Sequence, residues 1–395
     1  MYRIGEEEVQ AVREALLGKR MWRYQQCSQT ELFEQALAEK MDAGYVLALS
    51  SGTGALMAAL TALGVGPGDE VLVPAYTYIA TAIAPLAVGA VPILVETDAT
   101  LTMDVADLRR KITPRSRAII PVHINGHPCA MDDILALAAE FGLLVLEDAC
   151  QSVGGSYRGR RLGTLGDMGA FSFNYFKIIS CGEGGAVLTR DPALYERARI
   201  YHDSGLSFFS PEQKVQVPLF AGISLRISEL LSAVLGVQLG RLDGILEDLR
   251  ACKKALGTLI GAGPGWKPSP MHDPDGDCGI KLGLLLDTPE RVQKVIGILK
   301  DAGFSLGLEC PYYTQRHVYI NWEVVLEQRG AGHPLRNPFR DMPVPYTRDM
   351  CPATLDWLRR TLYIYTNPDL TPDEVEAAGR QIRDALASAA RENTV

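Results

Sequence analysis

Short apolar strands alternate with helical segments through the first half of the chain, and this alternation limits the possible folds more than any other feature. The helical segments include residues 105–111 and 131–141, whose apolar side chains recur at helical spacing. Parallel strands need crossover helices of this kind, and those helices cover both faces of the sheet. The sequence therefore predicts an α/β fold with a mostly parallel sheet. The predicted strands are residues 45–49, 71–73, 91–95, 118–122 and 143–146.

Three residues suited to ligand binding come shortly after predicted strands. Gly52, Tyr78 and Asp148 each lie at the carboxyl end of one of these strands. In open sheets of this class, ligands bind in the crevice outside the carboxyl ends. We therefore expect these three residues to lie at one ligand site.

A lysine, Lys177, lies in an aromatic and aliphatic segment that begins as a strand at Phe171 and ends in the glycine-rich turn 182–185. Such a lysine either extends its ammonium group to water or is held for chemistry. Loss of water around an amine lowers its pKa, which makes it a nucleophile toward an aldehyde. This segment alone is compatible with both interpretations.

Small residues fill the turn between strand 45–49 and the helix that follows it, where residues 50–54 read Ser-Ser-Gly-Thr-Gly. Backbone N–H groups in such a turn can point at an anion, and the helix dipole favours a phosphate there. An ordinary helix N-cap uses the same residue types. The phosphate loop of NTPases is excluded because no lysine follows.

Ser172, Lys177 and the glycine turn 182–185 together resemble the Schiff-base segment of the DegT/DnrJ/EryC1/StrS family of sugar aminotransferases, which use pyridoxal phosphate. The resemblance implies that Lys177 carries pyridoxal 5'-phosphate as a Schiff base, with pyridoxamine phosphate as the half-reaction form, and that Ser172 contacts the cofactor. The start of the first crossover helix is similar to the family's Ser-Gly-Thr-x-Ala-Leu turn. That likeness implies that Gly52 and Thr53 bind the cofactor phosphate.

Two further segments resemble the same family. A Pro-x-x-Thr-aromatic-x-x-Thr pattern implies that Tyr78, rather than Tyr76, stacks on the cofactor ring, although a core tyrosine is the alternative. A Glu-Asp-Ala-x-Gln segment implies that Asp148 partners the pyridine nitrogen and that Gln151 lies near the phenolic oxygen. A carboxylate there keeps the nitrogen protonated, so that the ring can accept electrons. Glu147 is the competing carboxylate, and a helix N-cap is the alternative role for Asp148.

Residues 222–226, Gly-Ile-Ser-Leu-Arg, resemble a Gly-x-Asn-x-Arg segment of the family, but Ser224 replaces the asparagine. In the family this asparagine reaches the cofactor phosphate from the neighbouring subunit. The resemblance therefore implies a homodimer with shared active sites and a cofactor-binding position for Ser224. Arg226, His317 and Tyr319 are candidate substrate-binding residues, the last two in loop-like sequence.

The resemblance covers roughly residues 5–250 and implies fold type I, the architecture of aspartate aminotransferase. We expect a large cofactor-binding domain with N-terminal helices at residues 1–250 and a small C-terminal α+β domain at residues 251–395, where the pattern changes. Residues 204–221 are expected to form an irregular loop.

Composition restricts the partners and the compartment. The net charge of −8, from 39 basic and 47 acidic side chains without a basic run, argues against nucleic-acid binding. The eight cysteines include no Cys-x-x-Cys pair, so we expect reduced thiols, and no metal-ligand cluster is found. No run approaches 18 apolar residues and the N-terminus carries no apolar targeting segment, which predicts a soluble cytoplasmic protein without a membrane partner.

The resemblance implies an enzyme that transfers an amino group from an amino acid, glutamate or glutamine, to a keto-sugar or keto-cyclitol in amino-sugar or antibiotic biosynthesis. Lys177 would carry the cofactor and then act as general acid and base. Other pyridoxal phosphate chemistry on the same scaffold is one alternative. A non-catalytic binding or regulatory role is another, which has no need of both Lys177 and Asp148. The acceptor could be nucleotide-linked, phosphorylated or free.

Overall fold

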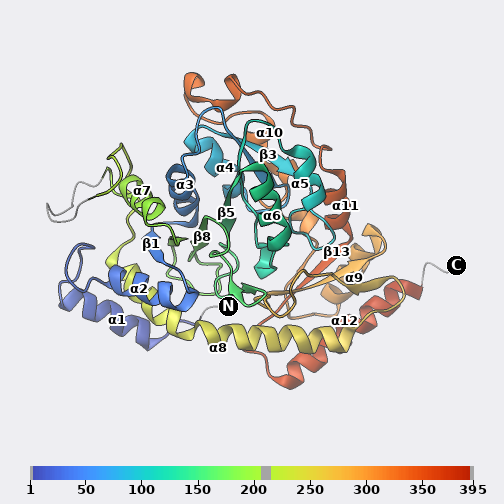
Figure 1. Cartoon of the computed structure of the whole chain (residues 1–395). Coiled ribbons are helices and arrows are strands. Elements are labelled where there is room, and N and C mark those ends of the chain that lie inside the picture. Colours follow the sequence, from blue (N-terminus) through green and yellow to red (C-terminus); the bar gives the residue numbers. More distant parts are fainter. Residues whose placement is uncertain (1–2, 206–214, 392–395) are drawn as a thin grey trace.

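The computed structural model describes residues 3–205 and 215–391, and Figure 1 shows a large α/β unit beside a smaller one. Seven of the described strands form the larger sheet. Six of them run in the same direction, and β9, which lies between β1 and β8, runs in the opposite direction. The predicted α/β fold with a mostly parallel sheet is confirmed. In sheet order the strands are β1 (Tyr45–Leu49), β9 (Gly185–Thr189), β8 (Met168–Ser172), β5 (Leu144–Asp148), β4 (Ser116–Ile119), β2 (Glu70–Pro74) and β3 (Val91–Val95).

Helices cover both faces of this sheet because successive side chains of a strand point to opposite faces. On β1, Leu47 and Leu49 belong to one buried cluster, whereas Val46 and Ala48 belong to the other. The first cluster includes side chains from α3 (Gly52–Ala62), α4 (Ala80–Val88) and α7 (Pro192–His202). The second includes side chains from α2 (Gln29–Met41), α5 (Val105–Lys111), α6 (Met131–Phe141) and α8 (Glu229–Ile260).

The long helix α8 connects the two units. It packs against α1 (Glu6–Leu17) and α2 at one end and against α12 (Pro372–Arg391) at the other (Figure 1). Apolar side chains along its whole length are buried, including Leu235, Leu242 and Leu256. The expected domain boundary at residue 250 therefore lies inside one continuous helix.

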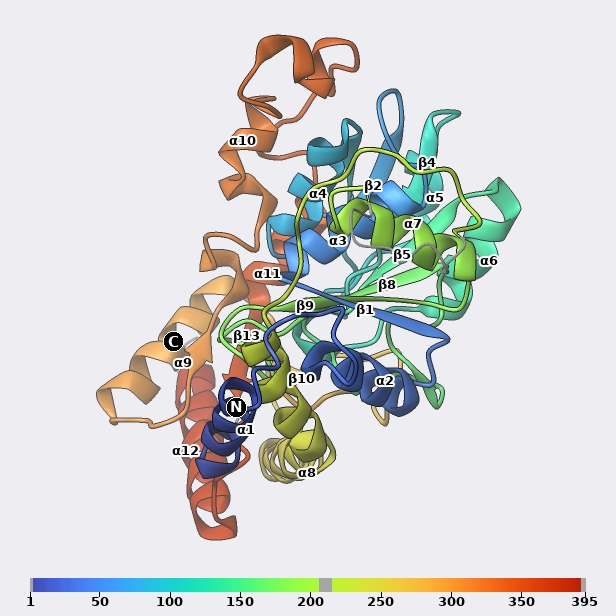
Figure 2. The same ribbon diagram turned by 90° about the vertical axis from the view of Figure 1, so that its left-hand side faces the viewer.

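The smaller unit is an antiparallel sheet with helices, in the order β10 (Trp266–Pro268), β11 (Lys281–Leu286), β13 (Thr361–Tyr365) and β12 (Leu308–Glu309). The helices α9 (Pro289–Asp301) and α12 pack against each other, and their apolar side chains share a buried cluster with this sheet. Figure 2 shows both helices on the same side of the molecule as α8.

The segment between β12 and β13 leaves the small sheet and returns to the large unit. Trp322, Val325 and Leu355 are buried in the same cluster as the side chains of α3 and α4, and Figure 2 shows α10 extending beside α4. Much of the sequence expected in the small domain thus packs on the large one. Its elements are η2 (Pro311–Tyr313), η3 (Tyr319–Asn321), α10 (Glu323–Leu326), η4 (Pro334–Arg336), η5 (Pro338–Arg340) and α11 (Pro352–Arg360).

The remaining elements are the turn η1 (Ile124–Gly126) and the hairpin of β6 (Ser156–Tyr157) and β7 (Arg160–Arg161). Of the loop expected at residues 204–221, residues 206–214 lie outside the described part of the chain. Among the helices that the structure describes, none combines the length and the apolar character needed to cross a membrane.

Candidate active site

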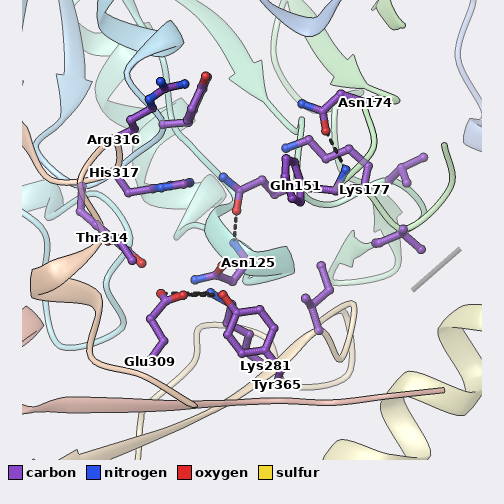
Figure 3. A pocket seen from close by; sticks show the side chains of 16 residues that line it. Asn125, Gln151, Asn174, Lys177, Lys281, Glu309, Thr314, Arg316, His317 and Tyr365 are labelled. Carbon is purple, nitrogen blue, oxygen red and sulfur yellow. Dashed lines mark hydrogen bonds and ion pairs between the residues drawn. The ribbon is translucent and has the colours of Figure 1, made fainter. Parts of the chain in front are cut away.

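A cavity of about 420 Å³ opens between the carboxyl ends of the large sheet and the small sheet. Figure 3 shows its side chains arranged around a central space, with Lys177 on one side and Glu309 and His317 on the other. The two units thus build the cavity together. The large unit contributes Tyr78, Asn125, Gln151, Asn174 and Lys177, the small sheet contributes Lys281, Glu309 and Tyr365, and the segment after β12 contributes Thr314, Arg316 and His317.

Lys177 lies in the turn between β8 and β9 and points its side chain into the cavity (Figure 3). Its backbone N–H donates to the Asn174 carbonyl oxygen at 3.1 Å, which holds the turn. Burial lowers the pKa of the Lys177 amine, while Cys150 and the carboxylate of Asp148 oppose this effect. A larger fraction of the amine is therefore neutral, and hence nucleophilic, than for a lysine in water.

The two adjacent carboxylates at the end of β5 point to opposite faces of the sheet. Glu147 is fully buried, accepts hydrogen bonds from the backbone N–H groups of Gly163, Leu165 and Gly166 at 2.6–2.9 Å, and contacts His123 at 3.0 Å. It holds the loop before β8 in place. Glu147 is therefore engaged in the interior, on the face away from Asp148.

Asp148 lies on the side of Lys177. Its Oδ2 accepts a hydrogen bond from the Thr81 hydroxyl at 2.7 Å, and its Oδ1 accepts one from the Cys150 backbone N–H at 3.1 Å. Its charge opposes the fall in the pKa of Lys177 that burial causes. Among the described residues, no cation forms an ion pair with Asp148 within 4.0 Å. A buried carboxylate without such a partner favours a cationic or protonated ligand group.

The start of α3 lies directly against Ser172. A Cβ atom at Gly52 would stand 2.7 Å from the Ser172 Cβ, so a larger residue would not fit without displacing Ser172. The Ser51 hydroxyl caps the helix by accepting from the Gly54 N–H at 3.0 Å. Gly52 and Thr53 are the first two residues of the helix, where N–H groups lack helical partners. This close approach leaves a cradle of backbone donors beside the Ser172 hydroxyl.

Tyr78, Gln151 and His317 all line the cavity, as their predicted roles require. Gln151 is oriented by its Oε1 atom, which accepts a hydrogen bond from the Asn125 N–H at 3.0 Å. The Tyr78 ring lies 5.5 Å from the His317 ring, and Tyr76 lines the same cavity at 6.5 Å from it. Burial and the nearby lysines lower the pKa of His317 to about 4, so the ring is neutral near pH 7.

Tyr319 does not line the cavity. It is fully buried, and its hydroxyl donates to the Arg348 carbonyl oxygen at 2.7 Å and accepts from the Cys351 N–H at 3.1 Å. These contacts tie the returning segment to itself. The structure thus places Tyr319 in the core, away from the substrate position that the sequence suggested.

Ser224 and Arg226 also lie outside the cavity of their own chain. Ser224 is exposed and pairs with Asp203 in an isolated bridge. Arg226 forms an ion pair with the buried carboxylate of Asp203. The Leu225 side chain between them would contact a Cβ atom placed at Gly54, which puts the segment beside the start of α3.

Several cavity residues were not anticipated from the sequence, and four of them come from the small sheet and from the turn η1. Lys281, Glu309 and Tyr365 come from three strands of the small sheet, and Asn125 comes from the turn η1. Lys281 carried a usable signal, because it opens an otherwise apolar strand, Lys-Leu-Gly-Leu-Leu-Leu. The other three follow no spacing that points to a site.

Comparison with known proteins gives a consistent result. A family model described as "DegT/DnrJ/EryC1/StrS aminotransferase family" matches residues 2–325. GDP-perosamine synthase of Caulobacter vibrioides is 42% identical over 226 residues, 57% of this chain and 59% of that protein. The spore coat polysaccharide biosynthesis protein SpsC of Bacillus subtilis is 30% identical over 98% of this chain and 96% of its own length. L-glutamine:2-deoxy-scyllo-inosose aminotransferase of Micromonospora echinospora is 39% identical over 58% of this chain and 56% of that protein.

The match spans less than three fifths of the length of two of these relatives, 59% of GDP-perosamine synthase and 56% of the inosose aminotransferase. Among solved structures, 3-amino-5-hydroxybenzoic acid synthase superimposes with a TM-score of 0.80 at 28% identity, covering 98% of both chains. DesV of S. venezuelae, in complex with a ketimine intermediate, superimposes with a TM-score of 0.79 at 30% identity, covering 96% of this chain and 94% of its own. These likenesses confirm the predicted fold class over both units.

Proposed function

The chain belongs to the DegT/DnrJ/EryC1/StrS aminotransferase family, and from this premise we propose that it transfers an amino group from an amino acid to a keto-sugar or keto-cyclitol. Pyridoxal phosphate is the cofactor of this family. The observation that carries the proposal is the position of Lys177 and Asp148. A half-buried amine in the turn after β8 and a buried carboxylate without a cationic partner at the end of the adjacent strand β5 lie at the carboxyl ends of the sheet.

The residues at this end of the sheet fit the cofactor. Gly52 leaves a space beside Ser172 that any Cβ atom would fill, at the N-terminus of an 11-residue helix. Backbone N–H groups and the helix dipole in such a position bind phosphate. We assign Gly52, Thr53 and Ser172 to the phosphate, Lys177 to the aldehyde, Tyr78 to the face of the ring and Gln151 to its phenolic oxygen.

When bound, pyridoxal phosphate supplies an aldehyde that condenses with amines and a ring that takes up the electrons of a breaking Cα–H bond. Asp148 would hold a proton at the pyridine nitrogen, and the Thr81 hydroxyl fixes the orientation of that carboxylate. The Lys177 Nζ atom, whose pKa burial lowers, is suited to take up and return a proton. Tyr78 and His317 line the cavity together, with their rings 5.5 Å apart.

We assign glutamate or glutamine as the amino donor and a keto-sugar or keto-cyclitol as the acceptor, with support from the relatives. One relative is named for L-glutamine and a cyclitol ketone, and others are named for GDP- and dTDP-linked amino sugars. A cavity of about 420 Å³ with polar groups on several sides suits a small polar ring.

A homodimer with shared sites is part of the proposal. Tyr175 and Phe176, immediately before Lys177, are 63% and 76% exposed, and Leu219 and Ile223 beside Ser224 are also exposed. Large exposed apolar side chains that gather beside a site are typical of an interface. A second copy of the chain that covered them would bring its own Ser224 segment to this region, next to the cofactor.

The direct test combines a spectrum, a label and a product. The purified protein should absorb visible light through its bound cofactor, and borohydride should fix that cofactor to Lys177 by peptide mapping. Incubation with glutamate or glutamine and a panel of keto-sugars and keto-cyclitols should give an aminated product by mass spectrometry. A label on another lysine would refute the site assignment. A different product with an intact label would indicate other chemistry of the same cofactor.

A further inference from the structure

We propose that Asn125 and Glu309 form a hydroxyl-binding subsite for the acceptor. The ketone that this protein aminates would then carry free hydroxyl groups on the ring carbons away from its keto group. This inference rests on the proposed aminotransferase function and names the class of acceptor that the cavity takes.

Asn125 offers an unused hydrogen-bond donor to the cavity. The residue is 7% exposed and lines the cavity, and its Nδ2 atom has no hydrogen-bond partner in the described structure. The hydroxyl groups of Tyr76 and Tyr363 are polar neighbours of this amide, and the Asn125 side chain opposes the rise that burial causes in both tyrosine pKa values. A buried amide N–H group is costly to leave unpaired, so such groups are paired in nearly all proteins. A ligand atom in the cavity would satisfy it.

The backbone at Asn125 holds this amide in place. Its φ of 53° and ψ of 24° lie in the left-handed region, which asparagine tolerates better than most residues. The backbone N–H group of Asn125 donates to the Oε1 atom of Gln151, the residue assigned to the cofactor. A left-handed residue with an unpartnered side chain in a cavity is strained in two ways, and such strain gathers at ligand sites.

Glu309 supplies the complementary acceptor. Its carboxylate oxygens each lie 3.1 Å from the Lys281 Nζ atom, and Oε2 also accepts a hydrogen bond from the Tyr365 hydroxyl. Lys281 lies 4.2 Å from the centre of the Tyr365 ring, directly across β11 and β13 from it. These contacts fix the carboxylate, which keeps further lone pairs for a ligand.

Figure 3 shows Asn125 between Gln151 and the Lys281–Glu309 pair, on the small-sheet side of the cavity. The subsite thus lies beyond the cofactor-binding residues. A ring whose keto carbon reached Lys177 would extend its other carbons toward this wall.

The charge beside Asn125 favours hydroxyl groups over anions. Lys281 and Glu309 neutralise each other, and an anion placed against Glu309 would be repelled by its carboxylate, whereas the Arg316 guanidinium on the segment after β12 is the cavity cation suited to the donor's carboxylate. A hydroxyl group can accept from the Asn125 N–H and donate to the Glu309 carboxylate. A site built in this way rejects an analogue that lacks the hydroxyl, because its own buried groups are then left unpaired.

The test compares ketones that differ by one hydroxyl group. One pair is scyllo-inosose and its 4-deoxy derivative, which lacks the hydroxyl group opposite the keto carbon. The second pair is dTDP-4-keto-6-deoxyglucose and its 2-deoxy derivative, which carry the ring on a nucleotide and differ at a carbon not bonded to the keto carbon. The kcat/KM for each ketone is measured with the donor-loaded holoenzyme. For the pair that reacts, we expect the wild-type protein to prefer the hydroxylated ketone by about tenfold or more.

Two variants change the hydrogen-bonding groups at nearly constant size: Asn125→Asp replaces the N–H donor with a carboxylate oxygen, and Glu309→Gln removes the negative charge and one acceptor oxygen. Each variant should lower the ratio of the two kcat/KM values toward one, because it slows the reaction of the hydroxylated ketone. The half-reaction with the donor should proceed as in the wild type. Asn125→Gly, which suits the left-handed backbone, should do the same if the aspartate variant folds poorly. Asn321→Asp is the matched control, because Asn321 is exposed outside the cavity, and it should retain the wild-type preference.

Three results would overturn the subsite. They are a wild-type protein without a preference, variants that slow both members of a pair equally, and no turnover of any of the four ketones by a protein that accepts the amino group from its donor. Failure of the proposed function looks different, since the donor half-reaction itself would then be absent.

Discussion

The two walls of the cavity hold their charged groups in opposite ways. On the large-unit side, Lys177 lines the cavity and Asp148 ends the strand β5 behind it, and neither has an ion-pair partner within 4.0 Å among the described residues. On the small-sheet wall, Lys281 and Glu309 are paired with each other and with Tyr365. Unpaired charges are available for chemistry, whereas paired charges give a fixed, neutral surface. Under the proposed function, the large-unit wall would react with the substrate and the small-sheet wall would recognise it.

The largest expected effect belongs to the two lysines. Lys177→Ala should retain the fold and bind cofactor without a covalent link, but the half-reaction with glutamate should slow by about a thousandfold or more, since the covalent anchor and the proton carrier are lost together. Lys281→Ala should slow that half-reaction by about tenfold at most. Single-turnover product formation measures both. Equal losses in the two variants would refute the division between the walls.

The two carboxylates of β5 give the next largest effect. Asp148→Asn should keep cofactor and fold but lose about a hundredfold or more in transamination, because an amide cannot stabilise a protonated pyridine nitrogen. Glu147→Gln should instead lose about 1–3 kcal/mol of unfolding free energy, because it disturbs a fully buried acceptor of three backbone N–H groups. Kinetics and urea unfolding of both variants decide between the roles. An inactive but stable Glu147→Gln protein would reverse the assignment.

The same contrast explains what the sequence could predict. Gly52, Tyr78 and Asp148 follow strands of a regular strand–helix alternation, so their meeting at one edge follows from the topology. Their short motifs also carry a family resemblance. The fold class was therefore predictable, and the large-unit wall was predictable as a candidate.

The small-sheet wall was not predictable in this way. Glu309 and Tyr365 lie 56 residues apart in the sequence and meet across neighbouring strands of an antiparallel sheet. Tyr319 misled because it shares loop-like sequence with His317 but turns into the core. The domain boundary predicted at residue 250 falls inside α8, because the buried side chains of that helix continue to Ile260. Pairing between distant segments leaves no local period to detect.

A shared site would add a third wall from the partner subunit. Lys177→Ala subunits are mixed with Ser224→Asp subunits, whose added charge would repel the cofactor phosphate of the neighbour. Random exchange puts about half of the subunits into mixed dimers with one intact site, so activity should rise to about a quarter of the wild type. Activity assays after verified subunit exchange measure this. No recovery would mean that Ser224 acts within its own chain or not at all.

The pH dependence tests whether the small-unit side takes part in proton transfer. The folded pKa of His317 is about 4, against about 6.5 in an unfolded chain, so His317 should add no inflection to the kcat/KM profile between pH 5 and 8. Between pH 6.5 and 4 the unfolded chain binds the proton more readily, so acidification lowers stability. The Tm of the His317→Gln variant should therefore fall less than the Tm of the wild type when the pH is lowered from 6.5 to 4. A kcat/KM inflection that disappears in His317→Gln would make this residue an acid or base.

The smallest expected effect concerns Ser224, where this chain departs from the asparagine of its family. A serine hydroxyl reaches less far than an asparagine amide, so a contact with the neighbour's cofactor phosphate would need a bridging water. Arg226 is held by the buried Asp203 in its own chain, which makes it a poor substitute for that contact. Ser224→Asn should then restore a direct hydrogen bond to a charged group, worth about 1.5–3 kcal/mol, and slow the loss of cofactor on dialysis while the dimer stays intact. The Ser224→Asn substitution also enlarges an exposed side chain. Ser228→Asn, at the exposed N-cap of α8, therefore serves as the control for side-chain size and polarity alone. Faster loss in Ser224→Asn, or equal retention in the wild type and both variants, would show that the serine position does not reach the phosphate, and the partner's contribution to the third wall would have to come from elsewhere.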